Sequence, residues 1–467
     1  MEQIPSPLSL PIFSRISAIV DRLGVEAYVV GGFVRDHYLH RPCTDIDIVV
    51  VGSGVAVAEE LGRELHTNVS IFKRFGTAML HADGMEVEFV GARKESYSPD
   101  SRKPSVEEGS LEDDQRRRDF TINAMAWSLN SATFGTLVDP FDGICDMDDC
   151  IICTPCDPDI TFSDDPLRMM RAIRFATQLG FEIEDETFAA IMRNRHRIEI
   201  VSAERITTEL NKILLSPVPS IGFYLLKSAG LLELIFPELH ALTGIDRVGK
   251  HAHKDNFVHT MKVLDNLART SDDLWLRWAA LLHDIAKPQT KSYDPKIGWS
   301  FHGHEVLGSK MIQPIFRRHK LSLGEPMKFV RKLVFLHLRP IVLSESIVTD
   351  SAVRRLLFEA GDDIEALMLL CEADITSGIE SKVKRYMANF EIVRQKMKEL
   401  EERDRIRNFQ PPITGEIIMK RYNIAPCSAI GEIKEVIKNA ILDGTIPNEY
   451  EAAYALMEKI AAERGLV

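Results

Sequence analysis

The feature that most constrains this chain is a glycine pair, Gly31-Gly32, followed shortly by Asp45-Ile-Asp47. Apolar residues precede the glycines and follow the aspartates, so both motifs adjoin predicted β-strands. Side chains on a strand alternate between its faces, and Asp45 and Asp47 therefore project from the same side. Carboxylates placed in this way can share divalent cations, and Mg²⁺ prefers such oxygen ligands.

The glycine pair adds a second constraint. Glycine lets the backbone approach a ligand closely, and the amides that open a helix favour a phosphate group. Each motif alone is common in turns and at strand ends, so the interpretation depends on their combination. Together, the two motifs predict a site for a nucleoside triphosphate with Mg²⁺.

The pattern Gly-Gly-x-Val-Arg-Asp followed by Asp-x-Asp resembles the first motif of the polymerase β-like nucleotidyltransferases. Among them it is most similar to the bacterial-type (class II) tRNA nucleotidyltransferase and poly(A) polymerase family. The resemblance implies an α+β fold, in which a small head with a mixed sheet and helices is followed by a long all-α body. It also implies that Asp45 and Asp47 bind Mg²⁺ and act in catalysis, and that Gly31, Gly32 and Arg35 hold the triphosphate.

Two further segments of the head carry the same resemblance. Residues 117–124 read Arg-Arg-Asp-Phe-Thr-Ile-Asn-Ala, which matches a family motif letter for letter. The match implies that Arg118 contacts the triphosphate, and that Asp119 and Asn123, four apart on a predicted helix, contact the sugar. Glu88 falls where the family commonly has a third catalytic carboxylate, although it can equally belong to the solvent face of its strand.

A third block, residues 164–175, begins a predicted helix with two acids and a proline. In the resembled family, the pair equivalent to Asp165 and Arg168 reads the base of CTP or ATP. Asp164 departs from the family pattern, which has glutamate there. The nucleotide-binding residues implied by this block are Asp165, Arg168, Arg171 and Arg174.

Histidines and acids in the second half of the chain form a different pattern, which resembles the HD phosphohydrolases. An adjacent His283-Asp284 pair ends an apolar segment, with His259 before it and Asp374 after it. A lone histidine on an apolar helix usually belongs to the core, but this set is typical of metal sites. The resemblance implies a divalent transition metal or Mg²⁺ on His259, His283, Asp284 and Asp374, with His304 as a further candidate, and a phosphohydrolase activity.

Length and composition suggest several domains in a cytoplasmic protein. Read with the two resemblances, the 467 residues divide into an expected nucleotidyltransferase head (1–150), a helical neck for nucleotide and base recognition (151–242), an HD-type domain (243–385) and a C-terminal helical body that binds RNA (386–467). No segment predicts a membrane span or a secretory signal, and seven cysteines indicate reduced thiols. The spacing of Cys150, Cys153 and Cys156, with Cys145 nearby, resembles metal ligation only loosely.

These observations predict a template-independent enzyme that adds or repairs the 3′-terminal CCA of tRNA from CTP and ATP, as a monomer or a homodimer. A poly(A) polymerase or an A-adding enzyme shares every motif of the head. Residues 72–79 lack the basic-aromatic signature of the polymerases, which favours CCA addition. A further alternative is an HD phosphohydrolase with a nucleotide-sensing head, although the intact Asp45 and Asp47 speak against it. A non-catalytic RNA-binding protein is disfavoured by the net charge of −12.

Overall fold

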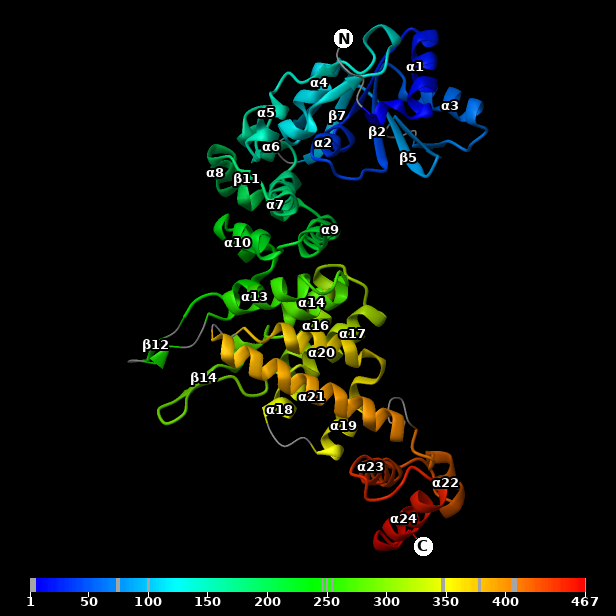
Figure 1. Ribbon diagram of the computed structural model, residues 1–467, viewed down its shortest axis with the longest axis vertical. Coiled ribbons are helices and arrows are strands. Elements are labelled where there is room, and N and C mark those ends of the chain that lie inside the picture. Colours follow the sequence, from blue (N-terminus) through cyan, green and yellow to red (C-terminus); the bar gives the residue numbers. More distant parts are fainter. Residues whose placement is uncertain are drawn as a thin grey trace. The chain divides into compact units, whose positions relative to one another are not determined.

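The computed structural model describes residues 6–72, 76–98, 101–245, 247–248, 251–252, 255–345, 349–376, 379–404 and 410–466. Its contacts divide the chain into two compact units, Met1–Pro237 and Glu238–Val467, whose elements are labelled in Figure 1. The four domain ranges from the sequence remain predictions. Residues 73–75, within the segment that favoured CCA addition, lie outside the described residues.

The first unit contains a mixed seven-stranded sheet with the order β3-β4-β5-β2-β1-β8-β9. Strands β2 and β5 pair in parallel, and the other neighbours pair antiparallel. The predicted mixed sheet is therefore confirmed. Its strands are β1 (Glu26–Val30), β2 (Asp45–Val51), β3 (Ser70–Phe72), β4 (Thr77–Ala82), β5 (Met85–Gly91), β8 (Ala126–Ser128) and β9 (Leu137–Val138).

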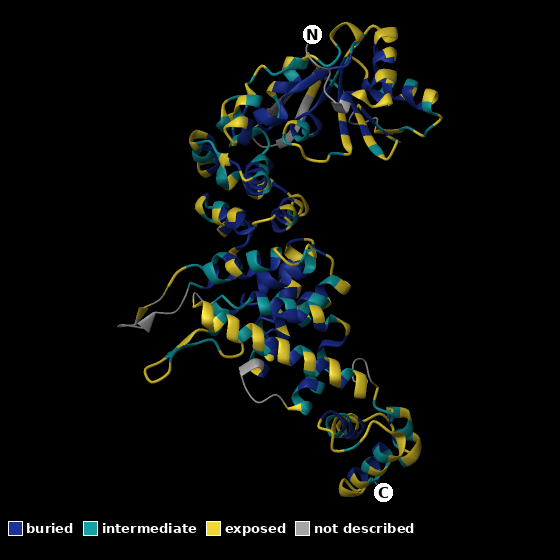
Figure 2. Ribbon diagram, viewed as in Figure 1, coloured by how far each residue is buried: buried dark blue, intermediate teal, exposed yellow. Residues whose placement is uncertain are grey.

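Helix α1 (Pro11–Leu23) is an amphipathic helix that packs against the sheet region. Its apolar residues recur at intervals of three and four, and Ile12, Ile16 and Ile19 are buried. Gly24 ends the helix in the left-handed conformation (φ 67°). The helix contacts β1 and α3 (Gly54–Leu65), and α3 also contacts β4 and β5. The buried faces of these elements form the core of the sheet region (Figure 2).

The remainder of the first unit is mainly helical. Two-stranded pairs join β6 (Arg93–Ser98) with β7 (Ser101–Glu108), and β10 (Ile151–Ile152) with β11 (Glu182–Ile183). Helix α2 (Gly32–Tyr38) directly follows β1. The later helices are α4 (Leu111–Arg116), α5 (Gly143–Asp148), α6 (Pro158–Asp164), α7 (Leu167–Leu179), α8 (Asp185–Asn194), α9 (Ala203–Leu214), α10 (Ser220–Ser228) and α11 (Leu232–Ile235).

The predicted helix through Asp119 and Asn123 is wrong. Asp119 lies in a bend, Phe120 is extended (φ −139°, ψ 153°), and only Thr121–Asn123 form a short 3₁₀ helix. A carboxylate oxygen of Asp119 accepts a hydrogen bond from the backbone N–H of Phe120 at 2.9 Å. This local bond competes with the helical pattern, which is a common property of aspartate.

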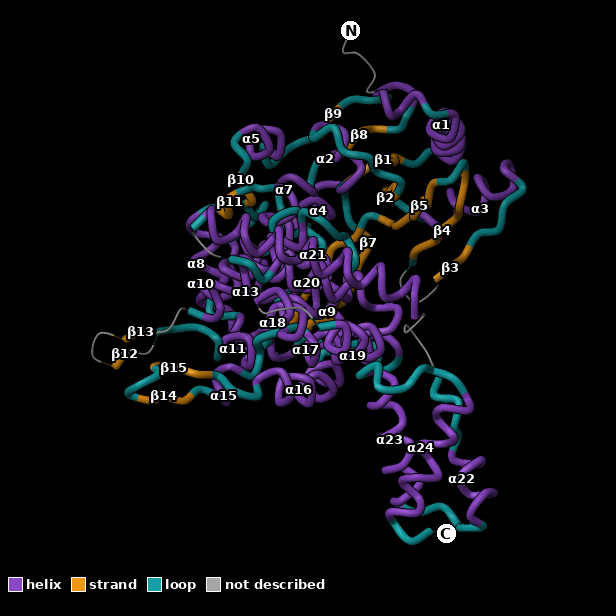
Figure 3. The backbone as a smooth tube through the Cα atoms, turned by 60° about the horizontal axis from the view of Figure 1, so that its bottom comes forward, coloured by secondary structure: helices purple, strands orange, loops and turns teal. Residues whose placement is uncertain are grey.

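The second unit is a helical body with two small hairpins that the prediction of an all-α body missed. They pair β12 (Arg247–Val248) with β13 (His251–Ala252), and β14 (Ser292–Asp294) with β15 (Gly298–Ser300) (Figure 3). The helices are α13 (Asn256–Ala268), α14 (Leu274–Leu282), α15 (Lys287–Thr290), α16 (His304–Arg318), α17 (Glu325–Leu336), α18 (Leu338–Glu345), α19 (Asp350–Ala360), α20 (Ile364–Ala373), α21 (Glu380–Asp404), α22 (Gly415–Tyr422), α23 (Ser428–Leu442) and α24 (Tyr450–Glu463).

Helix α14 is buried over most of its length. Every residue from Leu276 to Leu282 is buried, and α14 contacts α13, α17 and α20. Because the helix is surrounded by packed helices, the His283-Asp284 pair that follows it is held inside the unit. None of the helices that the structure describes is both long and apolar enough to cross a membrane.

Candidate active sites

The predicted carboxylates of the head lie side by side on strands β2 and β5. The parallel register pairs Asp47 with Glu88, and Asp45 with Glu86. Side chains two residues apart share a face, so Asp45, Asp47 and Glu88 are brought together. Burial raises the pKa of Asp47, and the negative charge of Asp45 adds to this effect. The pKa of Glu88 is raised by burial and by the charge of Asp47.

Gly31 is fitted closely between this row of carboxylates and an arginine. Its φ of +72° favours glycine. A Cβ atom at this position would lie 3.0 Å from Arg118 Nη1 and 3.6 Å from Asp47 Oδ2. The glycine turn, one catalytic candidate and one triphosphate candidate therefore meet at a single point, as the combination of motifs predicted.

Asp114 organises the arginines of this site and is absent from the residues predicted from the sequence. It is fully buried and accepts hydrogen bonds from Arg118 Nε at 3.0 Å and from Arg117 Nε at 2.9 Å. Burial acts to raise the pKa of Asp114, but the two guanidinium groups outweigh it and the pKa is lowered. Its position three and four residues before the arginines, on α4, is the signal that could have identified it.

A chain of polar contacts joins the glycine turn to helix α7. Arg35 donates to Asn123 Oδ1 at 2.7 Å and also pairs with Asp36. Asn123 donates to Asp119 Oδ1 at 3.0 Å, and Arg171 Nε donates to Asp119 Oδ2 at 2.7 Å. The structure thus brings four of the predicted nucleotide-binding residues into one network, in which their polar groups hold one another in place.

Helix α7 is tied to helix α9 by a second ion pair. Arg174 Nε lies 2.7 Å from Glu209 Oε2, and both residues are buried. Burial lowers the pKa of Arg174 to about 10, and Glu209 opposes this effect. The Arg174 guanidinium also lies 3.9 Å from the centroid of the Phe175 ring. Glu209 was not among the predicted site residues, because no short-range spacing links it to Arg174.

Asp165 and Arg168 occupy the start of α7 and are only half-buried. Asp165 accepts a hydrogen bond from the backbone N–H of Leu167 at 3.2 Å, and its other oxygen lies 3.7 Å from Arg205. Arg168 donates to the backbone carbonyl of Arg117 at 2.5 Å. Arg171 of the same block is also half-buried, whereas Arg174 is buried.

The contacts of Asp119 predict a measurable contribution to stability. Burial acts to raise its pKa, but Arg171 and Asn123 outweigh burial and bring the pKa to about 2. A carboxyl whose pKa falls from 3.8 to about 2 on folding contributes about 2 kcal/mol at neutral pH. We expect Asp119→Asn to lower the melting temperature of the first unit by roughly 4–8 °C in scanning calorimetry of the whole protein.

The effect of pH on the melting temperature provides a control for the Asp119→Asn prediction. The contribution is present above the unfolded pKa and is lost as the pH falls through the folded pKa, so the difference between Asp119→Asn and wild type should shrink between pH 4 and about 2. Asp148→Asn, at an exposed position of the same unit, should leave the melting temperature unchanged. An equal loss in both variants would contradict the assignment.

The predicted metal ligands of the second unit converge on two carboxylates. His259 Nε2 lies 2.9 Å from Asp374 Oδ1 and 3.4 Å from Asp284 Oδ2. His283 Nε2 lies 3.1 Å from Asp284 Oδ2, and His304 Nε2 lies 3.3 Å from Asp284 Oδ1. All five predicted residues, including His304, are therefore together although they come from distant parts of the chain.

His337 also belongs to this cluster of candidate metal ligands, and it was not predicted from the sequence. Its Nε2 lies 3.3 Å from His304 Nε2 and 3.9 Å from Asp284 Oδ1. In the sequence it stands between leucines at the end of an apolar helix, and such a histidine normally belongs to the core. The ligand atoms form two triads that share Asp284: His259, His283 and Asp284, and Asp284, His304 and His337.

Backbone contacts determine which ring nitrogens face these carboxylates. The Nδ1 atoms of His283, His304 and His337 lie 2.7–2.8 Å from the backbone carbonyls of Ala280, Phe301 and Val334. Because a carbonyl can only accept, each Nδ1 carries the hydrogen. In the neutral ring, each Nε2 then offers a lone pair, and burial lowers the pKa of His337 to about 4. Lone pairs that face one another and a carboxylate fit divalent cations.

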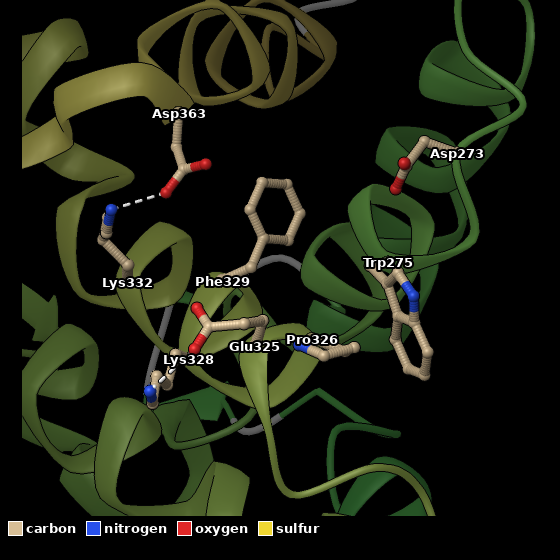
Figure 4. A pocket seen from close by; sticks show the side chains of 8 residues that line it. All are labelled: Asp273, Trp275, Glu325, Pro326, Lys328, Phe329, Lys332 and Asp363. Carbon is tan, nitrogen blue, oxygen red and sulfur yellow. Dashed lines mark hydrogen bonds and ion pairs between the residues drawn. The ribbon is translucent and has the colours of Figure 1, made fainter.

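A second hollow in this unit is not lined by the clustered histidines and carboxylates described above. It has a volume of about 450 Å³, and its charged side chains largely pair with one another (Figure 4). Lys332 lies 2.5 Å from Asp363, and Lys328 lies 2.8 Å from Glu325. The loosely metal-like spacing of Cys150, Cys153 and Cys156 also gains no support: all seven cysteines are free, and no metal-ligand group found among the described residues contains one.

Three known protein families match successive parts of the chain. Residues 27–153 match the family described as "Poly A polymerase head domain". Residues 180–243 match "Probable RNA and SrmB- binding site of polymerase A". Residues 256–379 match the HD domain. The two candidate sites lie in the first and third of these matches, apart from α7, which falls between the first two, and Glu209, which falls in the second.

Individual relatives agree with these matches. The chain is 32% identical to the multifunctional CCA protein of Nitrosococcus oceani over 374 residues, which cover 77% of this chain and 87% of that protein. The Bacillus stearothermophilus CCA-adding enzyme, solved with CTP, shares the fold (TM-score 0.69, 24% identity, 97% and 99% coverage). So does the Thermotoga maritima CCA-adding enzyme, solved with tRNA (TM-score 0.60, 24% identity, 98% and 96% coverage). The chain therefore belongs to the tRNA nucleotidyltransferase and poly(A) polymerase family, and it carries an HD domain.

Proposed function

We propose that this protein adds or repairs the 3′-terminal CCA of tRNA, from CTP and ATP and without a nucleic-acid template. The observation that carries the proposal is the row of Asp45, Asp47 and Glu88 beside Gly31 and Arg118. Similar proteins support the choice of substrates, because they include a multifunctional CCA protein and CCA-adding enzymes solved with CTP or tRNA.

The reaction joins the 3′-oxygen of the tRNA to the α-phosphorus of the nucleotide, and the bond to pyrophosphate breaks. Asp45, Asp47 and Glu88 fit a pair of Mg²⁺ ions, because they are clustered oxygen donors whose mutual repulsion a cation would relieve. Bound Mg²⁺ would activate the hydroxyl and neutralise the pyrophosphate. Gly31, Gly32 and Arg118 hold the triphosphate, and Arg35, through its bonds to Asp36 and Asn123, also shapes the glycine turn.

Selection of the nucleotide falls to the start of α7. Asp165 accepts from the exocyclic amino group of cytosine or adenine, and Arg168 donates to the ring acceptors. Uracil and guanine would leave these groups without partners, which disfavours both bases. Arg171 and Arg174 keep the helix in position through Asp119 and Glu209, and Asp119 and Asn123 lie near the sugar.

The proposal is tested by offering the purified protein tRNA transcripts that end at the discriminator base, at C or at CC, with each triphosphate separately. We expect CTP alone to add two residues to the first transcript, and ATP to add one residue only to the transcript ending in CC. Product lengths are read from a sequencing gel. Addition of A alone would identify an A-adding enzyme, long A tracts a poly(A) polymerase, and either result would overturn the proposal.

A second function is favoured by the histidines of the second unit. We propose that the HD domain is a metal-dependent phosphohydrolase that acts on phosphomonoesters or 2′,3′-cyclic phosphates. The nitrogen and oxygen donors of His259, His283, Asp284 and Asp374 suit a divalent transition metal and can also accept Mg²⁺. Such a cation would activate water for attack on phosphorus. Lys287, whose Nζ lies 2.5 Å from Asp284, is placed to contact the phosphate.

We further propose that the protein is cytoplasmic and acts as a monomer or a homodimer. Seven free cysteines suit a reducing compartment. Light scattering during gel filtration, with and without tRNA, distinguishes the two assembly states.

A further inference from the structure

A hollow of about 520 Å³ lies beside the metal-binding candidates of the HD domain, and His259 and Asp374 line part of it. Lys287 and Phe301 form another part of its wall. The remainder includes Lys382 and Tyr386 from helix α21, which lie beyond the residues matched by the HD domain (256–379). Helix α21 therefore lines part of a cavity whose candidate metal ligands come from the HD domain.

The sequence of α21 places a lysine, a tyrosine and a phenylalanine on the side of the helix that faces this hollow. Lys382, Tyr386 and Phe390 recur at intervals of four and therefore share a face. Phe390 is buried and attaches the helix to the rest of the unit. Lys382 and Tyr386 are left at the opening, where they are exposed and half-buried, respectively.

The charge of Lys382 is available to a ligand. In the part of the chain that the structure describes, no carboxylate lies within ion-pair distance of Lys382. Its neighbour Lys384, on another face of α21, instead lies 2.7 Å from Glu380. With Lys287 on the same hollow and cations on the histidines, the cavity would carry excess positive charge, which a phosphate dianion complements.

The aromatic side chains and the size of the hollow indicate which kind of phosphate ester it can bind. Tyr386 and Phe301 offer ring surfaces on which a nucleobase can stack. A volume of about 520 Å³ is within the range of small-molecule sites and leaves room for more than a phosphate ion. A nucleoside monophosphate combines the required charge with a flat ring.

We propose that α21 completes the substrate pocket of the HD domain and selects nucleoside monophosphates, with Lys382 contacting the phosphate and Tyr386 the base. This inference rests on the proposed phosphohydrolase function. In the reaction, the oxygen of one water forms a bond to phosphorus, the P–O ester bond breaks, and the nucleoside leaves as an alcohol with a proton from that water.

The test compares hydrolysis of adenosine 3′-monophosphate with that of glycerol 2-phosphate by the full-length protein loaded with Co²⁺. We expect Lys382→Ala to raise KM for both substrates about 10-fold, and Tyr386→Ala to raise KM about 10-fold for the nucleotide alone. In both variants kcat should stay within about twofold, since neither residue is a metal ligand. Lys384→Ala, on another face of the same helix, is the matched control and should resemble wild type.

The two substrates separate this pocket from a general effect of α21 on the fold. The proposal is wrong if Lys384→Ala raises KM as much as Lys382→Ala, or if Tyr386→Ala affects both substrates equally. Circular dichroism and the melting temperature confirm that each variant is folded.

A binding measurement separates failure of the pocket from failure of the phosphohydrolase. In a variant carrying Asp45→Asn and Asp47→Asn, Co²⁺ should occupy the HD domain alone, and its visible absorption should change on titration with adenosine 3′-monophosphate. A wild type without turnover would overturn the hydrolase proposal, whereas a spectral change weakened by Lys382→Ala would still support the pocket. No spectral change with the nucleotide would overturn the pocket itself.

Discussion

Replacing Asp47 by asparagine should lower the rate of nucleotide addition by about 10³-fold while the protein keeps or gains thermal stability. The loss of activity is expected because Asp47 lies between Asp45 and Glu88 and next to Gly31 and Arg118. Asparagine keeps the shape of the side chain but removes the negative charge that would bind Mg²⁺. Single-nucleotide addition to a tRNA transcript, followed on a gel, measures the effect.

The expected stability follows from the direction of the pKa shift. The folded pKa of Asp47 is raised by burial and by Asp45. Such a group contributes stability below its unfolded pKa, and the contribution is lost as the pH rises through the folded pKa. At neutral pH without metal, the ionised carboxylate is therefore unfavourable, and asparagine relieves the repulsion. The melting temperature without Mg²⁺ should not fall.

A matched carboxylate on the same sheet provides the control. Glu26 pairs with Val51, at the opposite end of the strands from Asp45. Glu26→Gln should leave addition close to the wild-type rate. Addition by Asp47→Asn at more than a tenth of the wild-type rate would remove this residue from the catalytic site, and with it the central part of the proposed function.

Asp284→Asn should abolish both metal binding and phosphohydrolase activity in the HD domain. Asp284 is the residue shared by the two ligand triads, and it is buried among four histidines whose Nε2 atoms lie 3.1–3.9 Å from its oxygens. The substitution takes a negative charge and one of the two carboxylate oxygens from the site. We expect metal content, measured by mass spectrometry after gel filtration, to fall to background and hydrolysis to fall at least about 100-fold.

The two activities should be separable in this variant. Asp284 lies in the second unit and the carboxylates of the head in the first, so nucleotide addition should stay within about twofold of wild type. Glu391→Gln, at an exposed position of α21, should change neither activity. Full metal content in Asp284→Asn would show that the cations bind elsewhere, and this would overturn the assignment of the ligands.

Much of the geometry of the candidate site could be predicted because it depends on residues that are close together in the sequence. Asp45 and Asp47 share a face because side chains alternate along a strand, and the glycine pair predicts a turn from adjacent residues alone. The helices of the second unit follow from apolar residues at intervals of three and four, as α13 and α20 show. His283 and Asp284 were recognisable because they are adjacent in the sequence.

The tertiary structure alone decided which distant residues meet. Glu88 joins Asp47 because β5 pairs with β2 in parallel, Glu209 meets Arg174 through the packing of α9 on α7, and His337 meets His304 through the packing of α17 on α16. Periodicity reports which face of an element a side chain occupies, but not which other element covers that face. Partners far apart in the chain are selected by the packing of the whole unit, and for that reason the two candidate ion-binding clusters become complete only in the folded protein.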